Sequence, residues 1–184
     1  YAILVAIVLG LNLMAMAANL LMVYLAIEFV SIGSYILTTY NFNKKSAEAG
    51  MKYILFGDFS SGIMLYGMSL LYGFTGSLSF NGDDLAASLS VINPMAVYIS
   101  LFLILAGILF KISVVPFHIW VPDVYEGAPT PMVAFFSIAP KAAGFALIIK
   151  LVFGFAHLDY FRVCAAFDPM FIQGFLAVLI LLTL

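Results

Sequence analysis

Charged residues are scarce in this chain: they make up only 9% of it, and the formal net charge is −2. A soluble domain carries about a quarter charged residues, so this composition argues against a soluble protein. The negative net charge and the lack of a basic cluster exclude a polyanion-binding role, including nucleic-acid binding.

Cysteine and histidine are also scarce. Cys164 cannot form an intrachain disulfide and leaves the redox compartment undetermined. Two histidines and one cysteine offer no ligand set for a haem or an iron–sulfur cluster. The sequence has no HExxH, Walker or dinucleotide-binding motif. We therefore expect no metal and no cofactor in this chain, and any redox chemistry belongs to partner proteins.

Hydrophobic residues, by contrast, make up 65% of the chain, and the mean hydropathy is +1.18. This composition predicts an integral membrane protein with an all-α, polytopic transmembrane fold. The chain opens at Tyr1 in an apolar run without a signal peptide and stops at Leu184 in another. We therefore expect an internal piece of a longer protein.

A helix needs about 20 apolar residues to cross the hydrocarbon core. The apolar runs predict a single transmembrane domain with spans near residues 1–17, 20–40, 49–73, 95–115, 131–155 and 165–184. Lys44 and Lys45 in the second connection favour a cytoplasmic position for that loop.

The fourth span is predicted to break near residues 111–116. Pro116 lacks the N–H that a helix needs, and its ring clashes with a carbonyl one turn earlier. The break frees backbone carbonyls beside Lys111, and such backbone is tolerated in a membrane only beside protein or water. A charge, a helix break and water at one point are the requirements for ion passage.

Three charged residues lie well inside the expected spans, where each costs about 2.5–3.5 kcal/mol on insertion scales. They are Glu28, Lys111 and Lys141, whereas Lys52 lies close enough to the 41–48 loop to extend to the surface. The alternative is that these groups are neutral or paired only for helix packing. A Lys–Glu pair about 4 Å apart is coupled by about 4 kcal/mol at an effective dielectric near 20, enough to drive proton transfer.

Other polar residues have less specific interpretations. Asp58 is expected to be buried in a small-residue stretch, where it lines a cavity or bonds across helices. His118 is either a hydrogen-bonded turn residue or a proton relay. Trp120 suits an interface anchor, and Asp123 and Glu126 are expected to cap or solvate the turn.

Three stretches together resemble the N-type antiporter-like subunit of NADH:quinone oxidoreductase, respiratory complex I. They are FKISVVPFHIWVPDVYEGAPTPMVAFFSIAPKAAGFALIIKL (110–151), LAIEFVSIGSYIL (25–37) and EAGMKYILFGDFSSGIMLYGMSLLYGFTGS (48–77). The VYEGAPTP form is similar to the N type rather than to the sister L and M types. The resemblance implies the first of two inverted five-helix repeats, with one broken helix, plus the start of the next helix.

The resemblance also implies site residues, all for proton translocation: Glu28 and Lys111 as the switching pair, Lys52 as modulator, Lys141 as onward carrier and His118 as a possible relay. A small residue usually stands in the family where this chain has Asp58.

The implied partners are other membrane-arm subunits and the lipid bilayer of a bacterial inner (plasma) membrane. NADH, FMN, iron–sulfur clusters and quinone are expected in the partner subunits. The open alternatives are a subunit of a related cation/proton antiporter or membrane-bound hydrogenase, and a structural membrane scaffold.

Overall fold

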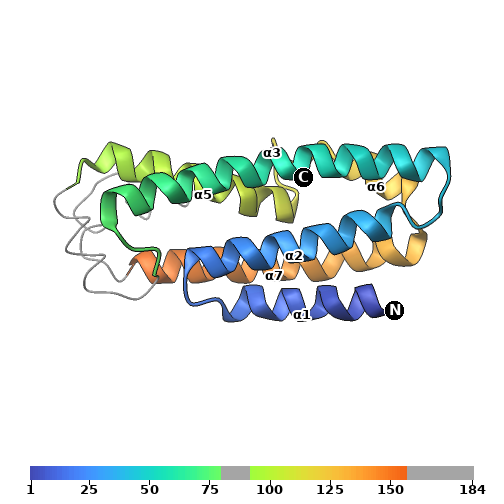
Figure 1. Ribbon diagram of the computed structural model, residues 1–184, viewed down its shortest axis with the longest axis horizontal. Helices are drawn as coiled ribbons and strands as arrows, with labels where there is room; N and C mark the ends of the chain where they lie inside the picture. The colour runs from blue at the N-terminus through green and yellow to red at the C-terminus, as the bar shows by residue number, and fades with distance from the viewer. Residues whose placement is uncertain (80–91, 157–184) are drawn as a thin grey trace.

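The computed structural model describes residues 1–79 and 92–156, so the sixth expected span, 165–184, lies outside the described residues. The regular secondary structure of the described residues is helical apart from one β-bridge between Asn19 and Ser79, and Figure 1 shows the helices lying roughly along one long axis. The prediction of an all-α fold is confirmed. The helices are α1 (Ala2–Met16), α2 (Leu20–Thr38), α3 (Lys44–Thr75), α5 (Pro94–Ile112), α6 (Val121–Gly127) and α7 (Thr130–Ala156).

Four helices are long and apolar enough to cross a membrane. They comprise Leu20–Thr38, Lys44–Thr75, Met95–Ile112 and Thr130–Leu151, and α1 is a shorter apolar helix. Four such helices in one chain make this an integral, multi-pass membrane protein.

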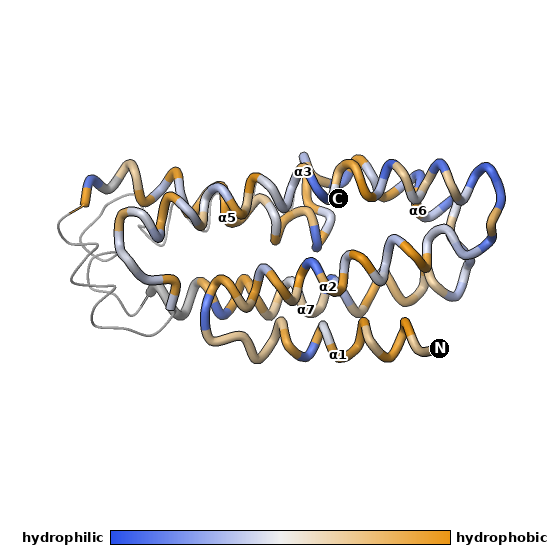
Figure 2. The backbone as a smooth tube through the Cα atoms, in the orientation of Figure 1, coloured by the Kyte–Doolittle hydropathy of each residue, from blue (hydrophilic) through white to orange (hydrophobic). Residues whose placement is uncertain are grey.

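The helix α3 begins at Lys44, earlier than the expected third span, because a capping box starts it. The Asn43 side chain accepts a hydrogen bond from the Ser46 backbone N–H at 2.8 Å, and the Asn43 N–H donates to Ser46 Oγ at 3.3 Å. At its 32 residues, α3 is about 48 Å long and extends beyond the hydrocarbon core. Figure 2 shows hydrophilic residues gathered at this end of the bundle.

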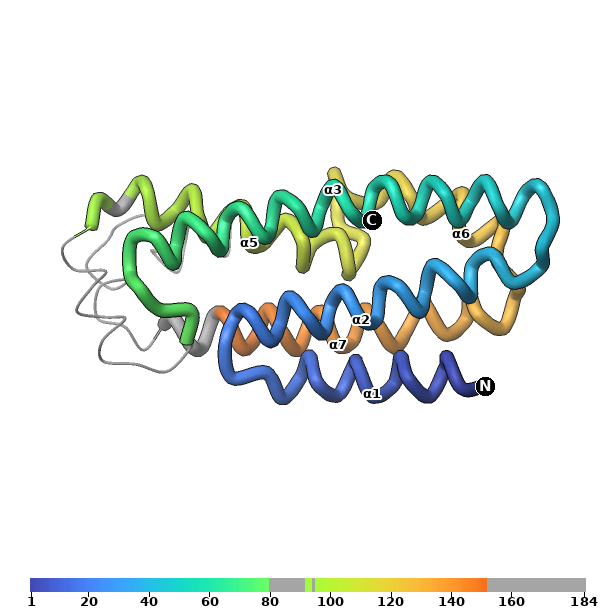
Figure 3. The backbone as a smooth tube through the Cα atoms, in the orientation of Figure 1, coloured from blue at the N-terminus to red at the C-terminus, as the bar shows by residue number. Residues whose placement is uncertain are grey.

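The helices pack around an apolar core. The main packing pairs are α3 with α5, α1 with α2, and α2 with α3, while α7 packs against α5 and α1, as Figure 3 also shows. Glycines bring α3 and α5 close together: a Cβ on Gly107 would lie 2.6 Å from Met64 Sδ, and one on Gly67 would lie 2.7 Å from the Ser100 carbonyl oxygen.

The break after α5 falls where the sequence predicts it. The helix ends at Ile112, and Ser113 adopts a left-handed conformation with φ of 62°. Turns follow until α6 begins at Val121, and α6 lies beyond the end of α5 along the same long axis, packed against the first part of α3 (Figure 1). The helix is therefore interrupted directly after Ile112, and its direction is continued by α6.

Candidate functional site

Lys111 occupies the last turn of α5 and is only 2% exposed. Its Nζ donates a hydrogen bond to Ser31 Oγ on α2 at 3.1 Å, and Ser31 Oγ donates to the Ile27 carbonyl at 2.7 Å. The described residues thus give the buried ammonium a hydroxyl as its hydrogen-bond partner. We call Lys111, Ser31 and Glu28 the buried lysine site.

Glu28 lies on α2, one turn before Ser31, and is half-buried. Within residues 1–79 and 92–156, no ion pair of 4 Å or less joins Glu28 to Lys111. Ser31, which bonds to Lys111, lies one turn from Glu28 on α2. The site therefore combines a glutamate and a lysine, with a serine hydroxyl bonded to the lysine instead of the carboxylate.

An aromatic group covers the inner end of the break. Trp120 stacks on Tyr53 with ring centroids 4.2 Å apart and planes 9° apart, and its ring lies 5.4 Å from that of Phe110. Trp120 is 3% exposed, so its interpretation as an interface anchor is wrong. The physical reason is that the turns after α5 place Trp120 against Tyr53 of α3 and Phe110 of α5.

Five charged residues gather where α6 meets the start of α3, and we call them the peripheral charge cluster. Lys52 Nζ lies 3.0 Å from Asp123 Oδ1 and 3.0 Å from Glu48 Oε1, and Lys45 pairs with Glu126. All five side chains are at least 38% exposed. Asp123 and Glu126 are exposed, as expected for residues that solvate the turn, and both also form ion pairs that tie α6 to α3.

Lys141 follows Pro140 in α7 and is half-buried. Its Nζ lies 5.9 Å from the centroid of the Tyr125 ring on α6, within reach of a cation–π interaction. The Tyr125 hydroxyl is buried without a hydrogen-bond partner among the described residues, and burial raises the pKa of this phenol. Lys141 is thus placed beside α6 rather than in contact with Lys111.

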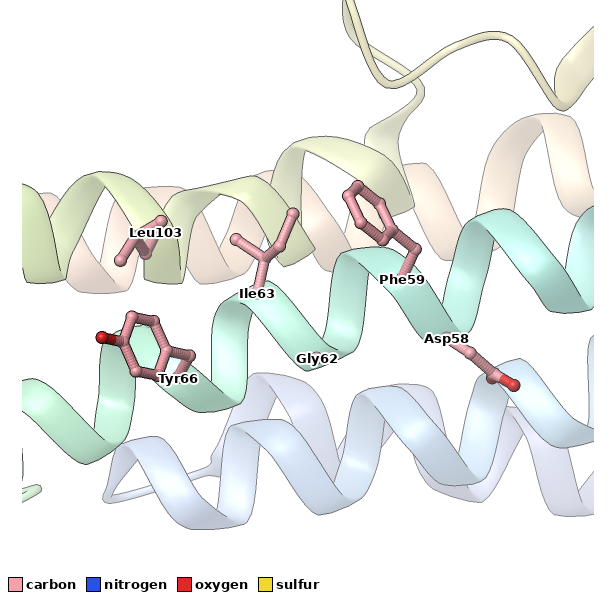
Figure 4. Close-up of a pocket in the computed structure, with 6 residues that line it drawn as sticks. All are labelled: Asp58, Phe59, Gly62, Ile63, Tyr66 and Leu103. Carbon is pink, nitrogen blue, oxygen red and sulfur yellow. The ribbon is translucent and has the colours of Figure 1, made fainter.

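The remaining sequence-predicted residues lie at the surface. His118 is exposed in the turn between α5 and α6. Asp58 is exposed as well and lines an open hollow on α3 (Figure 4), so its expected burial is wrong; small neighbours on one helix do not fix which way that face points. Among the described residues, no group of three His, Cys, Asp or Glu could hold a metal.

Residues 17–180 match the protein family described as NADH:quinone oxidoreductase/Mrp antiporter, TM. The chain is 48% identical over 149 residues to NADH-quinone oxidoreductase subunit N 2 of Sorangium cellulosum, covering 77% of this chain and 29% of that protein. It is 49% identical over 153 residues to subunit N of Bartonella bacilliformis, covering 82% and 31%. The chain therefore spans about a third of the length of these curated relatives.

Solved structures share the fold. Respiratory complex I from Thermus thermophilus contains a chain with a TM-score of 0.73 and 36% identity, covering 82% of this chain and 33% of that one. The membrane-bound sulfane sulfur reductase, an archaeal respiratory membrane complex, gives a TM-score of 0.74 at 30% identity, covering 86% and 32%. The Mrp complex from Dietzia sp. gives 0.69 at 23% identity, covering 82% and 28%, which is a likeness of fold alone.

Proposed function

This chain belongs to the NADH:quinone oxidoreductase/Mrp antiporter family of membrane proteins, and on that premise we propose that it is a proton-translocating membrane-arm subunit of an NADH:quinone oxidoreductase. The relatives at 48% and 49% identity carry the name subunit N. In this proposal, electrons pass from NADH to quinone in partner subunits, and this chain moves protons without a redox cofactor of its own.

One observation carries the proposal: a lysine that is 2% exposed stands at the break of a membrane helix, bonded to a serine that lies one turn from a glutamate. An ammonium in such a place is costly. A structural role would favour a carboxylate in direct contact with it, whereas a hydroxyl partner leaves the lysine free to gain and lose a proton.

The proposed mechanism divides the work among six residues. Glu28 and Lys111 are the switching pair, and Ser31, which sequence reasoning missed, holds the Lys111 amine in place through their 3.1 Å hydrogen bond. A change of charge at Glu28 alters how strongly Lys111 holds its proton. Lys141 is the onward carrier, and His118 is a relay in the exposed turn.

Lys52 is the proposed modulator, and its partners suggest how it acts. Its ammonium bonds to Asp123 on α6, and α6 directly follows the turn that leaves Lys111. A change at Lys52 would therefore reach the buried lysine site through the position of α6 rather than through direct contact.

The assembly around this chain is also a proposal. The partners are other membrane-arm subunits, and FMN, iron–sulfur clusters and quinone bind in subunits other than this one. The matching relatives named above are bacterial, so the proposed location is the bacterial inner (plasma) membrane.

The test is Lys111→Ala in the complete protein within its native membrane, with proton pumping, NADH oxidation by quinone and complex assembly measured together. We expect an assembled complex that loses most pumping and most quinone-linked oxidation. Lys44→Ala, at an exposed lysine at the start of α3, is the matched control and should leave both activities unchanged. Normal coupled pumping in Lys111→Ala would refute the assignment, and loss of assembly would favour a structural scaffold.

A second candidate is a subunit of a related cation/proton antiporter or membrane-bound hydrogenase. The fold likeness favours it, because the sulfane sulfur reductase chain fits this one as closely as the complex I chain does. Purification of the native complex separates the candidates: co-purifying NADH-oxidising flavin and iron–sulfur subunits support the first proposal. An assembly without redox subunits that exchanges Na⁺ for H⁺ would support an antiporter.

A further inference from the structure

Lys141 lies inside a membrane helix without a charged partner among the residues that the structure describes. It follows Pro140 in α7, within the apolar span Thr130–Leu151, and it is half-buried. Within residues 1–79 and 92–156, its Nζ forms no ion pair and no hydrogen bond. An ammonium inside a membrane helix is costly unless another group stabilises it, and its neighbour on α6 is suited to do so.

That neighbour is the ring of Tyr125. Lys141 Nζ lies 5.9 Å from the ring centroid, and the quadrupole of an aromatic ring attracts an ammonium that stands over its face. The Tyr125 hydroxyl is buried without a hydrogen-bond partner in the described part of the chain, so no hydrogen bond explains the position of the ring. Burial raises the pKa of this phenol, so the hydroxyl stays protonated. Lys141 therefore meets a neutral ring face and not a phenolate.

The helix that carries this ring is held against α3. Two ion pairs of the peripheral charge cluster join α6 to α3. Gly127, at the end of α6, approaches α3 so closely that an added Cβ would stand 2.5 Å from the Ala49 Cβ. Val124 of α6 is fully buried. The helix α6 is thus fixed to α3 by charge and by close packing, while Tyr125 connects it to Lys141 of α7.

We propose that Tyr125 is a positioning residue for proton transport, and that its ring face holds the Lys141 ammonium at α6. Lys141 is the onward carrier of the proposed function, on which this inference rests. Lys52 gains a route to that carrier, because its partner Asp123 lies on the same helix as the ring. A change at Lys52 that moves α6 therefore moves the ring that holds Lys141. The role requires an electron-rich ring face and no hydroxyl.

The ring is tested by graded fluorination in the full-length protein within its complete complex. Tyr125 is replaced by phenylalanine and by phenylalanines that carry one, two or three ring fluorines, which weaken the quadrupole while nearly keeping the size of the ring. We expect Tyr125→Phe to retain proton transport and each added fluorine to lower it. The trifluorinated ring should lower it by about fourfold, as expected for loss of one cation–π contact. Transport that stays constant along the series would overturn the proposal, and so would a Tyr125→Phe variant as defective as the trifluorinated one.

The matched control is the same series of rings at Phe136, which is buried on α7. Its ring lies 6.1 Å from that of Phe135, and it stands over no cation in the part of the chain that the structure describes. Fluorination at Phe136 should leave transport unchanged. An equal fall there would show that fluorine itself causes the loss, and it would overturn the proposal.

A second measurement does not depend on transport. Amide hydrogen exchange of α6 reports how readily this helix opens, and it is measured in the purified complex for the trifluorinated ring at Tyr125, for Lys141→Met and for both together. We expect each single change to raise exchange by about fourfold. The double change should raise it no further, because both changes remove the same contact.

This cycle separates a failure of the inference from a failure of the proposed function. Additive effects, or unchanged exchange in every variant, would overturn the inference even where Lys111→Ala abolishes pumping. Normal pumping in Lys111→Ala would refute the proposed function, whereas a coupled cycle would still place Lys141 on the ring of Tyr125.

Discussion

Lys111 and Lys52 lie on packed neighbouring helices, yet their surroundings are opposite. Lys111 is 2% exposed and bonds to one serine hydroxyl, whereas the Lys52 side chain is 38% exposed and bonds to the carboxylates of Glu48 and Asp123. The structure thus places carboxylates beside the ammonium of Lys52, whose charge water already stabilises. The ammonium of Lys111, whose charge is costly to bury, bonds to a hydroxyl instead.

Charged side chains therefore have two different roles in this protein. Exposed ion pairs contribute little to stability but hold one element beside another, as the peripheral charge cluster holds α6 beside α3. A buried ammonium lowers stability unless it is fully paired, so its presence points to a function. Substitutions in each region test whether the two lysines differ in this way.

The largest effect is expected at the buried lysine site. Lys111→Met keeps an unbranched side chain of similar length and removes the charge, so we expect coupled proton transport to fall by about a hundredfold. Thermal stability should stay the same or rise, because a buried charge is replaced by an apolar group. Pumping in vesicles and thermal unfolding of the purified complex check both parts. A clear loss of stability would mean that Lys111 is structural.

The next effect concerns Trp120, which lies between the two regions. Trp120→Leu removes the stack on Tyr53, and the opening free energy of α6 should fall by about 2 kcal/mol. Amide hydrogen exchange of residues 121–127 measures this value. Exchange that stays at the original rate would show that the peripheral charge cluster alone holds α6.

A smaller effect is expected from Ser31→Ala, which removes the hydroxyl bonded to Lys111. Transport should fall by about fivefold, the equivalent of about 1 kcal/mol for one lost hydrogen bond. Ser34→Ala is the matched control, because Ser34 is also buried on α2 but donates only to the Val30 carbonyl. Equal losses in the two variants would argue that the serines support helix packing and not the lysine.

The smallest effect is expected in the peripheral charge cluster. Asp123→Asn removes one carboxylate from Lys52, and exchange of the α6 amides should rise by about threefold, with a similar rise at high salt in the unchanged protein. Glu126→Gln, which affects the more exposed pair with Lys45, should change exchange less. A loss of transport as large as that of Lys111→Met would erase the distinction between the regions.

The break and its lysine could be predicted from the sequence because their causes are local. Proline cannot continue a helix wherever it stands, and Lys111 precedes Pro116 by little more than one turn. The apolar runs predicted helices in the same way. Ser31 escaped notice because a serine in a membrane helix usually bonds to its own backbone, as it also does here.

The incorrect predictions concern features that depend on residues far apart in the sequence. Lys52 and Asp123 are 71 positions apart, and the packing of α3 against α5 and α6 brings them together. The same packing buries Trp120, which periodicity alone could not indicate. Asp58 was expected to be buried because small residues surround it in the sequence; its outward direction depends on the packing of α3 against α2 and α5.

The end of α5 at Ile112 has an electrostatic consequence of its own. Aligned peptide dipoles place about half a negative charge at the C-terminus of a helix, and Lys111 occupies that last turn. The helix terminus therefore acts as a fixed counter-charge that no proton can neutralise. Glu28, by contrast, is a counter-charge that protonation can remove. The broken helix thus stabilises the Lys111 ammonium by a constant negative potential, whereas the negative charge of Glu28 on α2 changes with protonation.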